Sequence, residues 1–263
     1  MKPMNVFFAA ILSLLLFSCK KSDNPVPGPV VETKLLKKIY TSPNDFQLFT
    51  YNESKQLVKL TNQYVDDPIN NGIITEEAVL TYESNKLNKV QYADGYMTYH
   101  YTGDKLDSIR KYTLTSRLVS VDFPQINAQN QLLSITTRLP GLLPLLPVAA
   151  QRVFTYDAAG NLIGSSFALK MTNNSDFVLQ ERTVFSGYDS KRNPDQFSYT
   201  ESYIPGMVFM KNNPGRMQVY DHSNDLSEDI SFVYQFDTAG NIIKKTSTTV
   251  GSPNAEVAFY EYY

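Results

Sequence analysis

The sequence has few of the side chains that carry out most enzymatic and metal chemistry. Its 263 residues include one cysteine, two histidines and no tryptophan. A single cysteine excludes a disulfide within the chain, and so few Cys and His residues argue against a structural zinc site. The formal net charge is −2 and no long basic run occurs, so nucleic acid is a poor candidate partner. We expect no cofactor and no bound metal.

Familiar catalytic signatures are also missing, since no G-x-S-x-G, H-E-x-x-H or P-loop motif occurs. Asp221-His222-Ser223 has the residue types of a hydrolase triad, but sequence neighbours do not form a triad, because its side chains must converge in space. His100 alternates with tyrosines, which favours a packed or surface histidine over a base. The acidic pairs at 66–67 and 76–77 flank an Asn-Gly turn and are expected at a solvated tip. We therefore expect no catalytic residue.

What the sequence does have is aromatic and aliphatic residues in quantity. Hydrophobic residues make up 42% of the chain, with 18 Tyr and 15 Phe. Tyrosine, phenylalanine, valine and threonine favour strands over helices. The length is sufficient for one sizeable hydrophobic core and too short for several large domains.

The N-terminal segment predicts export and lipidation. Lys2 gives a positive start, and the apolar run at 6–17 is too short for a membrane span of about 20 residues. The run ends in "LFSC", which resembles the lipobox of bacterial lipoproteins. The resemblance implies cleavage before Cys19, transfer of a diacylglycerol to its thiol and acylation of the new amine. A buried cysteine near an ordinary signal peptide is the less favoured alternative.

These features divide the chain into three parts. Residues 1–18 are predicted to be a signal peptide, residues 19–33 a lipidated cysteine with a tether, and residues 34–263 a single domain. Pro25, Pro27 and Pro29 favour an extended tether. Several acyl chains would hold the protein stably at a membrane, whereas one chain binds only marginally.

One short pattern recurs along the domain. "YDAAGNLI" begins at Tyr156 and "FDTAGNII" begins at Phe236, and weaker copies begin at residues 51, 82, 101, 126, 188 and 220. The uneven spacing is typical of strand–turn–strand units with variable outer loops rather than of a strict solenoid.

Each copy is predicted to form a β-hairpin. Phe154 and Tyr156 lie on one face of an alternating strand, and an Asp or Asn then begins the turn. Gly160 and Gly240 can take a positive φ, whereas Lys, Asn or Asp fills that position in other copies, with Lys the poorest fit. Aliphatic residues resume the return strand. Asn-Gly at 71–72 and Asp-Gly at 94–95 predict two further, tighter hairpins.

The recurring pattern resembles that of YD-repeat (Rhs-like) proteins and of the small YD-repeat-like lipoproteins of Gram-negative bacteria. That resemblance implies an all-β fold, in which successive β-hairpins form a curled antiparallel sheet. Large members form hollow shells around toxins, but this chain is short and unevenly spaced, which does not favour a closed shell. Its last residues, "AEVAFYEYY" at 255–263, predict a terminal strand docked in the sheet.

Two Pro-Gly-apolar stretches interrupt the pattern, at 138–150 and 203–210. Prolines in the first exclude a regular helix or a central strand. Each stretch either packs on the sheet, which we favour, or borders an apolar groove for a ligand or partner. The candidate surface comprises Leu142, Leu143, Leu145, Leu146, Met207 and Phe209.

These observations favour a non-enzymatic envelope lipoprotein that acts as a binding or scaffolding module. The alternative is a carbohydrate-binding accessory lipoprotein of an outer-membrane uptake system, and a hydrolase is the least favoured. We expect a lipid anchor in the outer membrane of a Gram-negative bacterium, on the periplasmic face or the cell surface. The expected partners are the membrane and an envelope protein or glycan.

Overall fold

Residues 34–263 of the computed structural model form one unit, distinct from residues 1–33. The structure describes residues 34–67, 72–140, 147–195 and 202–263. Cys19, the leucines at 142–146 and residues 68–71 of the predicted Asn-Gly hairpin therefore lie outside the described residues. All the regular elements in the described part of the chain are β-strands.

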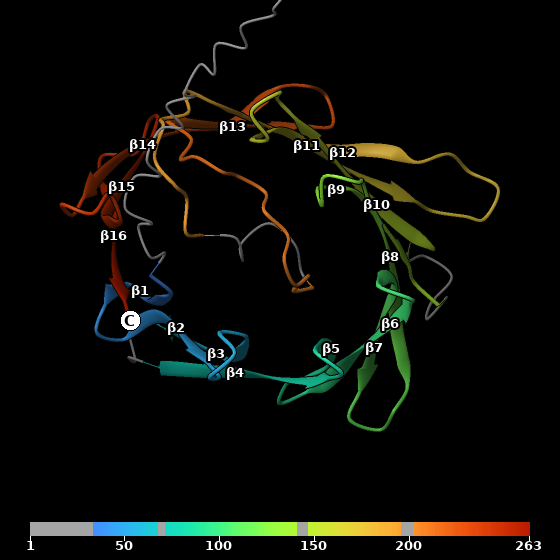
Figure 1. Cartoon of the computed structure of the whole chain (residues 1–263). Coiled ribbons are helices and arrows are strands. Elements are labelled where there is room, and N and C mark those ends of the chain that lie inside the picture. Colours follow the sequence, from blue (N-terminus) through green and yellow to red (C-terminus); the bar gives the residue numbers. More distant parts are fainter. Residues whose placement is uncertain (1–33, 68–71, 141–146, 196–201) are drawn as a thin grey trace, which may run out of the picture. The chain divides into compact units, whose positions relative to one another are not determined.

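Sixteen strands in the described residues form the wall of a closed barrel. They are β1 (Leu36–Ser42), β2 (Asp45–Tyr51), β3 (Leu57–Asp67), β4 (Gly72–Glu83), β5 (Lys86–Gln91), β6 (Gly95–Thr102), β7 (Lys105–Thr113), β8 (Leu118–Ile126), β9 (Leu132–Arg138), β10 (Ala149–Tyr156), β11 (Leu162–Lys170), β12 (Val178–Ser186), β13 (Arg216–Asp221), β14 (Leu226–Phe236), β15 (Ile242–Thr249) and β16 (Ala255–Tyr262). Each strand pairs antiparallel with its neighbours in sequence, and Figure 1 shows the strands as a ring.

The prediction of a single all-β antiparallel domain is confirmed, but the prediction of an open, curled sheet is wrong. The last strand closes the ring by pairing with the first, with Leu36 opposite Tyr262 and Ile39 opposite Tyr260. An open sheet would leave the backbone groups of both edge strands unpaired. Closure satisfies both edges, and it gives the predicted terminal strand two partners, β1 and β15.

Most copies of the YD pattern turn at one end of the barrel, which we call the hairpin end. Because antiparallel strands alternate in direction, the turns that follow β2, β4, β6, β8, β10 and β14 all lie there. The copy that begins at Tyr220 follows β13 and turns at the opposite end. The hairpin end therefore gathers polar turn residues that are far apart in the sequence.

The predicted turn chemistry is confirmed. Gly160 and Gly240 have φ values of 90° and 85°, and the equivalent Lys55 and Asn130 have values of 61° and 60°. The Asp157 carboxylate accepts a hydrogen bond from the Asn161 backbone N–H at 2.8 Å and so closes the turn. The same bond occurs in the hairpins that begin at residues 51, 126 and 236.

The first aromatic residue of the pattern has a second role, because it ties neighbouring hairpins together. Tyr101 donates its hydroxyl to the Leu87 carbonyl at 3.0 Å, and Tyr156 donates to the Leu132 carbonyl at 3.0 Å. In each case the acceptor is the first or second residue of the return strand of the preceding hairpin. Equivalent bonds run from Tyr82 to Leu57, from Tyr188 to Leu162 and from Tyr262 to Ile242.

One copy does not form the predicted hairpin. Asp189 follows Tyr188 as expected, but its carboxylate closes the turn with the backbone N–H of Asn213 at 3.1 Å. The Asp189 N–H in turn donates to the Asn213 carbonyl at 3.0 Å. Residues 190–212 are thus inserted into this turn. Their described parts, 190–195 and 202–212, lie within the ring of strands in Figure 1, between β12 and β13. We call residues 190–212 the inserted segment.

The hydrophobic core lies inside the barrel and includes part of the inserted segment. Ile204, Met207, Phe209 and Met210 are buried in the same cluster as inward-facing wall residues such as Phe154. The Phe154 and Phe209 rings lie 5.5 Å apart. The second Pro-Gly-apolar stretch therefore packs against the inner wall of the sheet, as favoured from the sequence.

The Asp-Gly hairpin predicted at 94–95 is present between β5 and β6. Its glycine is required by a close approach of the backbone rather than by a positive φ. A Cβ atom at Gly95 would lie 2.1 Å from the Tyr112 carbonyl oxygen, which no side chain tolerates.

Candidate binding cavity at the hairpin end

The predicted site residues that the structure describes lie inside the barrel. Phe209 is 2% exposed and packs in the core, where its ring lies 5.5 Å from that of Phe154. Met207 is 7% exposed, but it lines a cavity at the hairpin end. The structure thus brings Met207 to a site and places Phe209 behind it.

The two histidines lie apart on exposed parts of the barrel. His100 is on the outside of β6, where its Nε2 lies 2.9 Å from the Thr98 hydroxyl. Partial burial and the nearby Arg110 lower the pKa of His100. His222 is in the β13–β14 turn, where its Nε2 lies 3.2 Å from the Ser223 hydroxyl.

The acidic residues of the motifs at 221–223 and 76–77 have structural partners. Asp221 accepts hydrogen bonds from the backbone N–H groups of Ser223 and Asp225, so it caps the turn. Glu77 pairs with Lys59 on the barrel wall at 2.6 Å. Among the residues that the structure describes, no group of three or more His, Cys, Asp and Glu side chains is placed to hold a metal ion.

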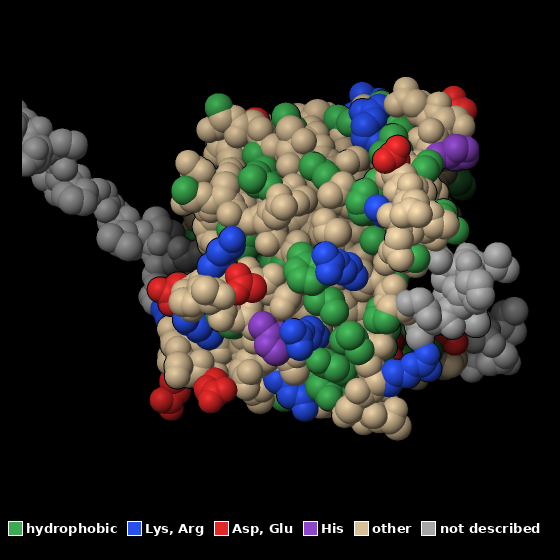
Figure 2. All heavy atoms as spheres, turned by 90° about the vertical axis from the view of Figure 1, so that its right-hand side faces the viewer, with side chains coloured by type: hydrophobic (Ala, Val, Ile, Leu, Met, Phe, Trp, Pro, Cys, Tyr) green, Lys and Arg blue, Asp and Glu red, His purple; other side chains and the backbone are tan. Residues whose placement is uncertain are grey.

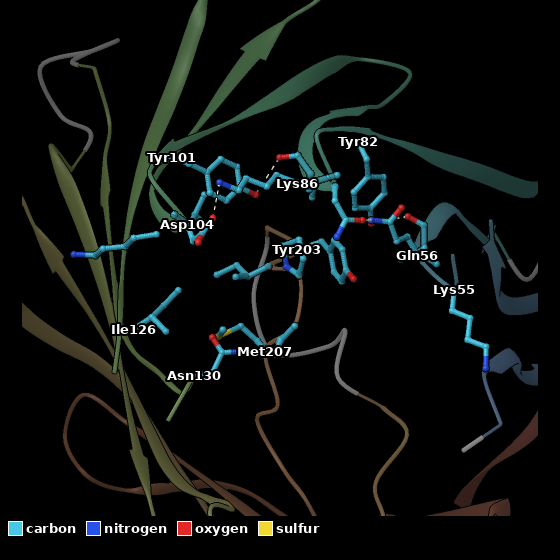
Figure 3. Close-up of a pocket in the computed structure, with 18 of the residues that line it drawn as sticks. Lys55, Gln56, Tyr82, Lys86, Tyr101, Asp104, Ile126, Asn130, Tyr203 and Met207 are labelled. Atoms are coloured by element: carbon cyan, nitrogen blue, oxygen red, sulfur yellow. Dashed lines mark hydrogen bonds and ion pairs between the residues drawn. The ribbon is translucent and has the colours of Figure 1, made fainter. Parts of the chain in front are cut away.

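The cavity at the hairpin end has a volume of about 500 Å³. Its lining comes from four successive hairpins, those of β2–β3, β4–β5, β6–β7 and β8–β9, and from residues 203–207 of the inserted segment. Figure 3 shows Tyr82, Lys86 and Tyr101 on the hairpin side, with Tyr203 and Met207 facing them. This volume lies within the usual range for small-molecule sites.

Tyrosines and leucines form the cavity floor. Tyr51, Tyr82 and Tyr101 are half-buried, and each is followed across the turn by a buried leucine at the start of the next strand, in its first or second position. Burial raises the pKa of all three tyrosine hydroxyls above the usual value, so they stay neutral and available as donors. The hydroxyls of Tyr82 and Tyr101 are fixed by the backbone bonds that tie the hairpins together, which leaves their ring faces toward the cavity.

The rim is formed by paired polar side chains from the turns. Gln56 donates from its Nε2 to the Asn85 Oδ1 at 2.8 Å, which joins the first two turns. Lys86 forms an ion pair with Asp104 at 2.8 Å and also donates to the Gly103 carbonyl. The hydrogen bond and the positive charge of Lys86 lower the pKa of Asp104.

The inserted segment closes the inner side of the cavity. The Tyr99 hydroxyl donates to the Tyr203 carbonyl at 2.8 Å, and Asn130 donates from its Nδ2 to the Gly206 carbonyl at 2.8 Å. Ser202 donates to the inward-facing Asp122 carboxylate at 2.8 Å. These bonds hold residues 202–206 against three different strands or turns of the wall.

The arrangement is suited to binding. The one carboxylate of the described lining, Asp104, is paired and has a lowered pKa, which makes it a poor general base. Gln56, Asn85 and Asp104 were not among the site residues expected from the sequence. The sequence did contain a signal for their proximity. Alternate strands of an antiparallel sheet end at the same edge, so the turns that follow them lie together.

Comparison with known proteins identifies the fold. Two crystal structures of porin-like proteins are similar to this chain. The protein from Bacteroides uniformis is 12% identical with a TM-score of 0.58, covering 87% of this chain and 98% of its own. The protein from Bacteroides vulgatus is 11% identical with a TM-score of 0.57, covering 88% and 99%. The chain has a porin-like barrel fold.

Comparison of the sequence gives no family. No protein-family profile matches the chain, and no curated protein matches it. The resemblance to YD-repeat lipoproteins therefore stays a prediction from the sequence. In the described part of the chain, no helix is long and apolar enough to cross a membrane.

Proposed function

We propose that this chain is a lipid-anchored, non-enzymatic binding module of the cell envelope of a Gram-negative bacterium, and that its ligand site is the hairpin-end cavity. The observation that carries the proposal is the cavity itself, a hollow of about 500 Å³ that four equivalent turns and the inserted segment build together. Its tyrosine rings and fixed amides suit recognition of a ligand.

The lipid anchor rests on the sequence. The apolar run at 6–17 ends in Leu16–Cys19, which provides the single cysteine at the position that lipidation requires. Acylation of Cys19 by several chains would give a stable anchor. The anchor would leave the barrel outside the bilayer, facing the periplasm or the cell surface.

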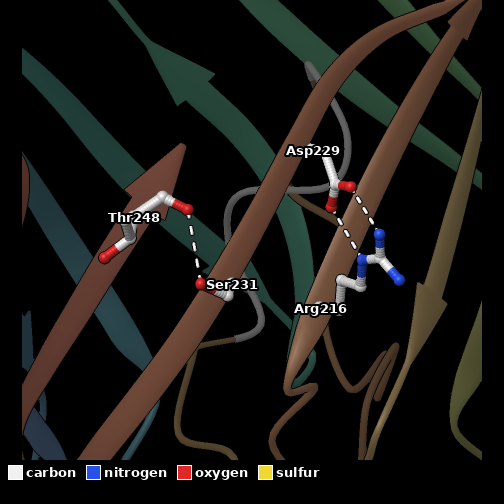
Figure 4. Close-up of polar contacts among 4 residues, drawn as sticks. All are labelled: Arg216, Asp229, Ser231 and Thr248. Carbon is white, nitrogen blue, oxygen red and sulfur yellow. Dashed lines mark hydrogen bonds and ion pairs between the residues drawn. The ribbon is translucent and has the colours of Figure 1, made fainter. Parts of the chain in front are cut away.

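The outer wall of the barrel supports this placement. Charged pairs lie on it, including Lys59 with Glu77 at 2.6 Å and Arg216 with Asp229, whose Nε and Oδ1 atoms lie 2.7 Å apart. Figure 4 shows that the Arg216–Asp229 pair neighbours Ser231, which donates to the Thr248 carbonyl. Figure 2 shows Lys, Arg and His side chains interspersed with apolar ones on the face over β6–β12. A wall against hydrocarbon is apolar, because an Arg or Lys at the bilayer midplane costs about 2–4 kcal/mol.

The filled interior supports binding over passage of solutes. The described residues of the inserted segment lie inside the ring of strands, where Ile204, Phe209 and Met210 are buried. It is held at its base, where Asn213 bonds Asp189, and within the lumen, where Tyr99 bonds the Tyr203 carbonyl. A pore would need this segment to leave the lumen, which would expose its apolar side chains to water.

In-cell crosslinking tests the proposal. A photo-reactive amino acid replaces Lys105, an exposed residue of the cavity rim, in the full-length chain expressed in its bacterium. The matched control carries it at Arg110, which is exposed on the same strand outside the cavity. We expect a discrete adduct from position 105 and none from position 110. Equal adducts from both positions, or none from either, would contradict a ligand site in the cavity.

A second measurement tests the anchor. In cells fed labelled fatty acid, the wild-type chain should carry label and sediment with membranes. The Cys19→Ala variant should lose the label and leave the membrane fraction. A Cys19→Ala chain that still sediments with membranes would show that another part of the protein holds it there.

A further inference from the structure

We propose that the hairpin-end cavity binds an uncharged, linear oligosaccharide. This inference rests on the proposed function, because it names the ligand class of that same site. It is argued from three properties of the lining: its periodicity, its hydrogen-bonding groups and its charge.

The cavity floor is periodic. Leu57, Leu87 and Leu106 are 3%, 1% and 5% exposed, and each is the first or second residue of the return strand of a successive hairpin. A half-buried tyrosine precedes each of these leucines across the turn. Equivalent positions are two strands apart, which is a separation of roughly 10 Å. A chain of similar units laid across the strands would meet the same aromatic and aliphatic surface at regular intervals.

The rim presents groups that match hydroxyls. Asn85 accepts from Gln56, while its own Nδ2 has no partner among the described residues. Asn130 donates to Gly206, while its Oδ1 has no partner within the same set. The lining thus offers a donor and an acceptor on side chains that existing bonds hold in place. A hydroxyl group both donates and accepts, so a polyol satisfies such a rim more completely than an apolar ligand does.

The tyrosine rings favour a ligand with apolar faces as well as hydroxyls. Tyr82 and Tyr101 have their hydroxyls fixed by backbone carbonyls at 2.9 Å and 3.0 Å. Their rings therefore present carbon surface to the cavity, as Figure 3 shows. A sugar ring has C–H faces that can pack on such surfaces and hydroxyls at its edge that reach the amides.

The charges of the site favour an uncharged ligand. Lys86 and Asp104 neutralise one another at 2.8 Å, so their pair offers no net charge to a ligand. Asp104 is the one carboxylate in the described lining, which disfavours a cation. The lining also includes Lys55 and Lys105, but both are exposed at the rim, where water and salt screen their charges from a ligand on the floor. The site also extends along the hairpin end, because an adjoining hollow of about 390 Å³ shares Asn130 and Gly206 with it. A ligand longer than a disaccharide could occupy both.

Calorimetric titration of the full-length lipidated protein in detergent tests the inference. The probes are uncharged β-1,4-glucan, α-1,4-glucan and β-1,4-xylan chains as di- and hexasaccharides, together with an acidic oligogalacturonate. We expect at least one uncharged hexasaccharide to bind at least tenfold more tightly than its disaccharide, since about tenfold corresponds to a few added contacts. The affinity of that hexasaccharide should change less than twofold between 50 and 500 mM salt.

Matched variants assign the binding to the cavity. Gln56→Ala with Asn85→Gly should weaken hexasaccharide binding about tenfold, and the glycine keeps the positive φ of 65° that the turn needs at position 85. Asn241→Ala is the control, because Asn241 is the equivalent of Gln56 in the β14–β15 hairpin and lies outside the cavity. It should bind like the wild type.

Three results would overturn the inference: no uncharged hexasaccharide binding at millimolar concentration, binding confined to the acidic probe, or equal affinity in the double variant and the wild type. The crosslinking at Lys105 separates this failure from that of the proposed function. A protein adduct from position 105 without saccharide binding would refute the saccharide as the ligand class and leave the proposed binding site standing. The absence of both would refute the binding site.

Discussion

Removal of single tyrosine hydroxyls should measure how strongly the hairpins are tied together. We consider Tyr101→Phe, Tyr156→Phe and Tyr262→Phe, which lie on the well separated strands β6, β10 and β16. Each hydroxyl donates to a backbone carbonyl, at 3.0, 3.0 and 2.9 Å respectively. The substitution keeps the ring in place, so the change in the free energy of unfolding reports the hydrogen bond with little loss of packing.

The expected magnitude follows from the partial burial of these sites. A neutral hydrogen bond contributes a net of about 1 kcal/mol. The tyrosines are half-buried and the accepting residues Leu87, Leu132 and Ile242 are each 1% exposed, so little water replaces the lost donor. Each variant should therefore lose about 1 kcal/mol, and the triple variant about 3 kcal/mol, because distant sites add. With a urea m value of about 3 kcal/mol per molar, the midpoint should fall by roughly 0.3 M for each single variant and 1 M for the triple.

Urea denaturation followed by far-ultraviolet circular dichroism is the assay. Tyr112→Phe is the matched control, because Tyr112 stacks on Tyr96 on the outer wall and its hydroxyl has no partner among the described residues. It should leave the midpoint within experimental error. A triple variant as stable as the wild type would refute the role given to these hydroxyls. A Tyr112→Phe control as destabilised as the three single variants would refute it as well.

Three further predictions follow from the fold. A chain ending after Asn254 lacks β16 and leaves one edge of β1 and one edge of β15 unpaired, so it should show no cooperative melting. Retention of the parent's melting temperature would contradict barrel closure as the source of stability. Asp189→Ala removes the bonds from Asn213 and from the Lys191 N–H, so it should cost about 3 kcal/mol and speed proteolysis within residues 190–212, as limited digestion would show. Burial raises the pKa of Tyr99, Tyr234 and Tyr260 above the usual value of about 10. The stability that these neutral hydroxyls contribute is therefore complete below pH 10, and it falls at higher pH by up to about 1.4 kcal/mol per pH unit for each. An unfolding free energy that is flat from pH 9 to 11.5 would contradict this.

The local structure could be predicted from the sequence because it depends on neighbouring residues. Asp157 and Gly160 lie within one turn, so their residue types alone indicate the carboxylate cap and the positive φ that the structure has. Even Lys55, the poorest fit to a left-handed conformation, adopts it, because the turn around it is closed by Asn52 and Gln56. The hairpin pattern therefore outweighs the preference of a single residue.

The arrangement of these hairpins depends on residues far apart in the chain, which is why it could not be predicted. Nothing near Tyr188 indicates that the turn after it is closed by Asn213, 24 residues beyond Asp189. The pairing of β1 with β16 likewise depends on the number and tilt of all the strands between them, which no single repeat encodes. The cavity depends on both the insertion after Asp189 and the closure of the barrel, since it forms where the turns of the hairpin end meet the inserted segment.

Cleavage of the tether in liposomes tests most directly the claim that lipid, and not the barrel wall, holds this protein at a membrane. A specific protease site is placed within residues 20–33 of the full-length lipidated chain, which is then reconstituted and digested. The account predicts that the barrel of residues 34–263 is released into the aqueous phase with its β-sheet circular dichroism intact. A cleaved barrel that remains with the liposomes after a wash in high salt would contradict it.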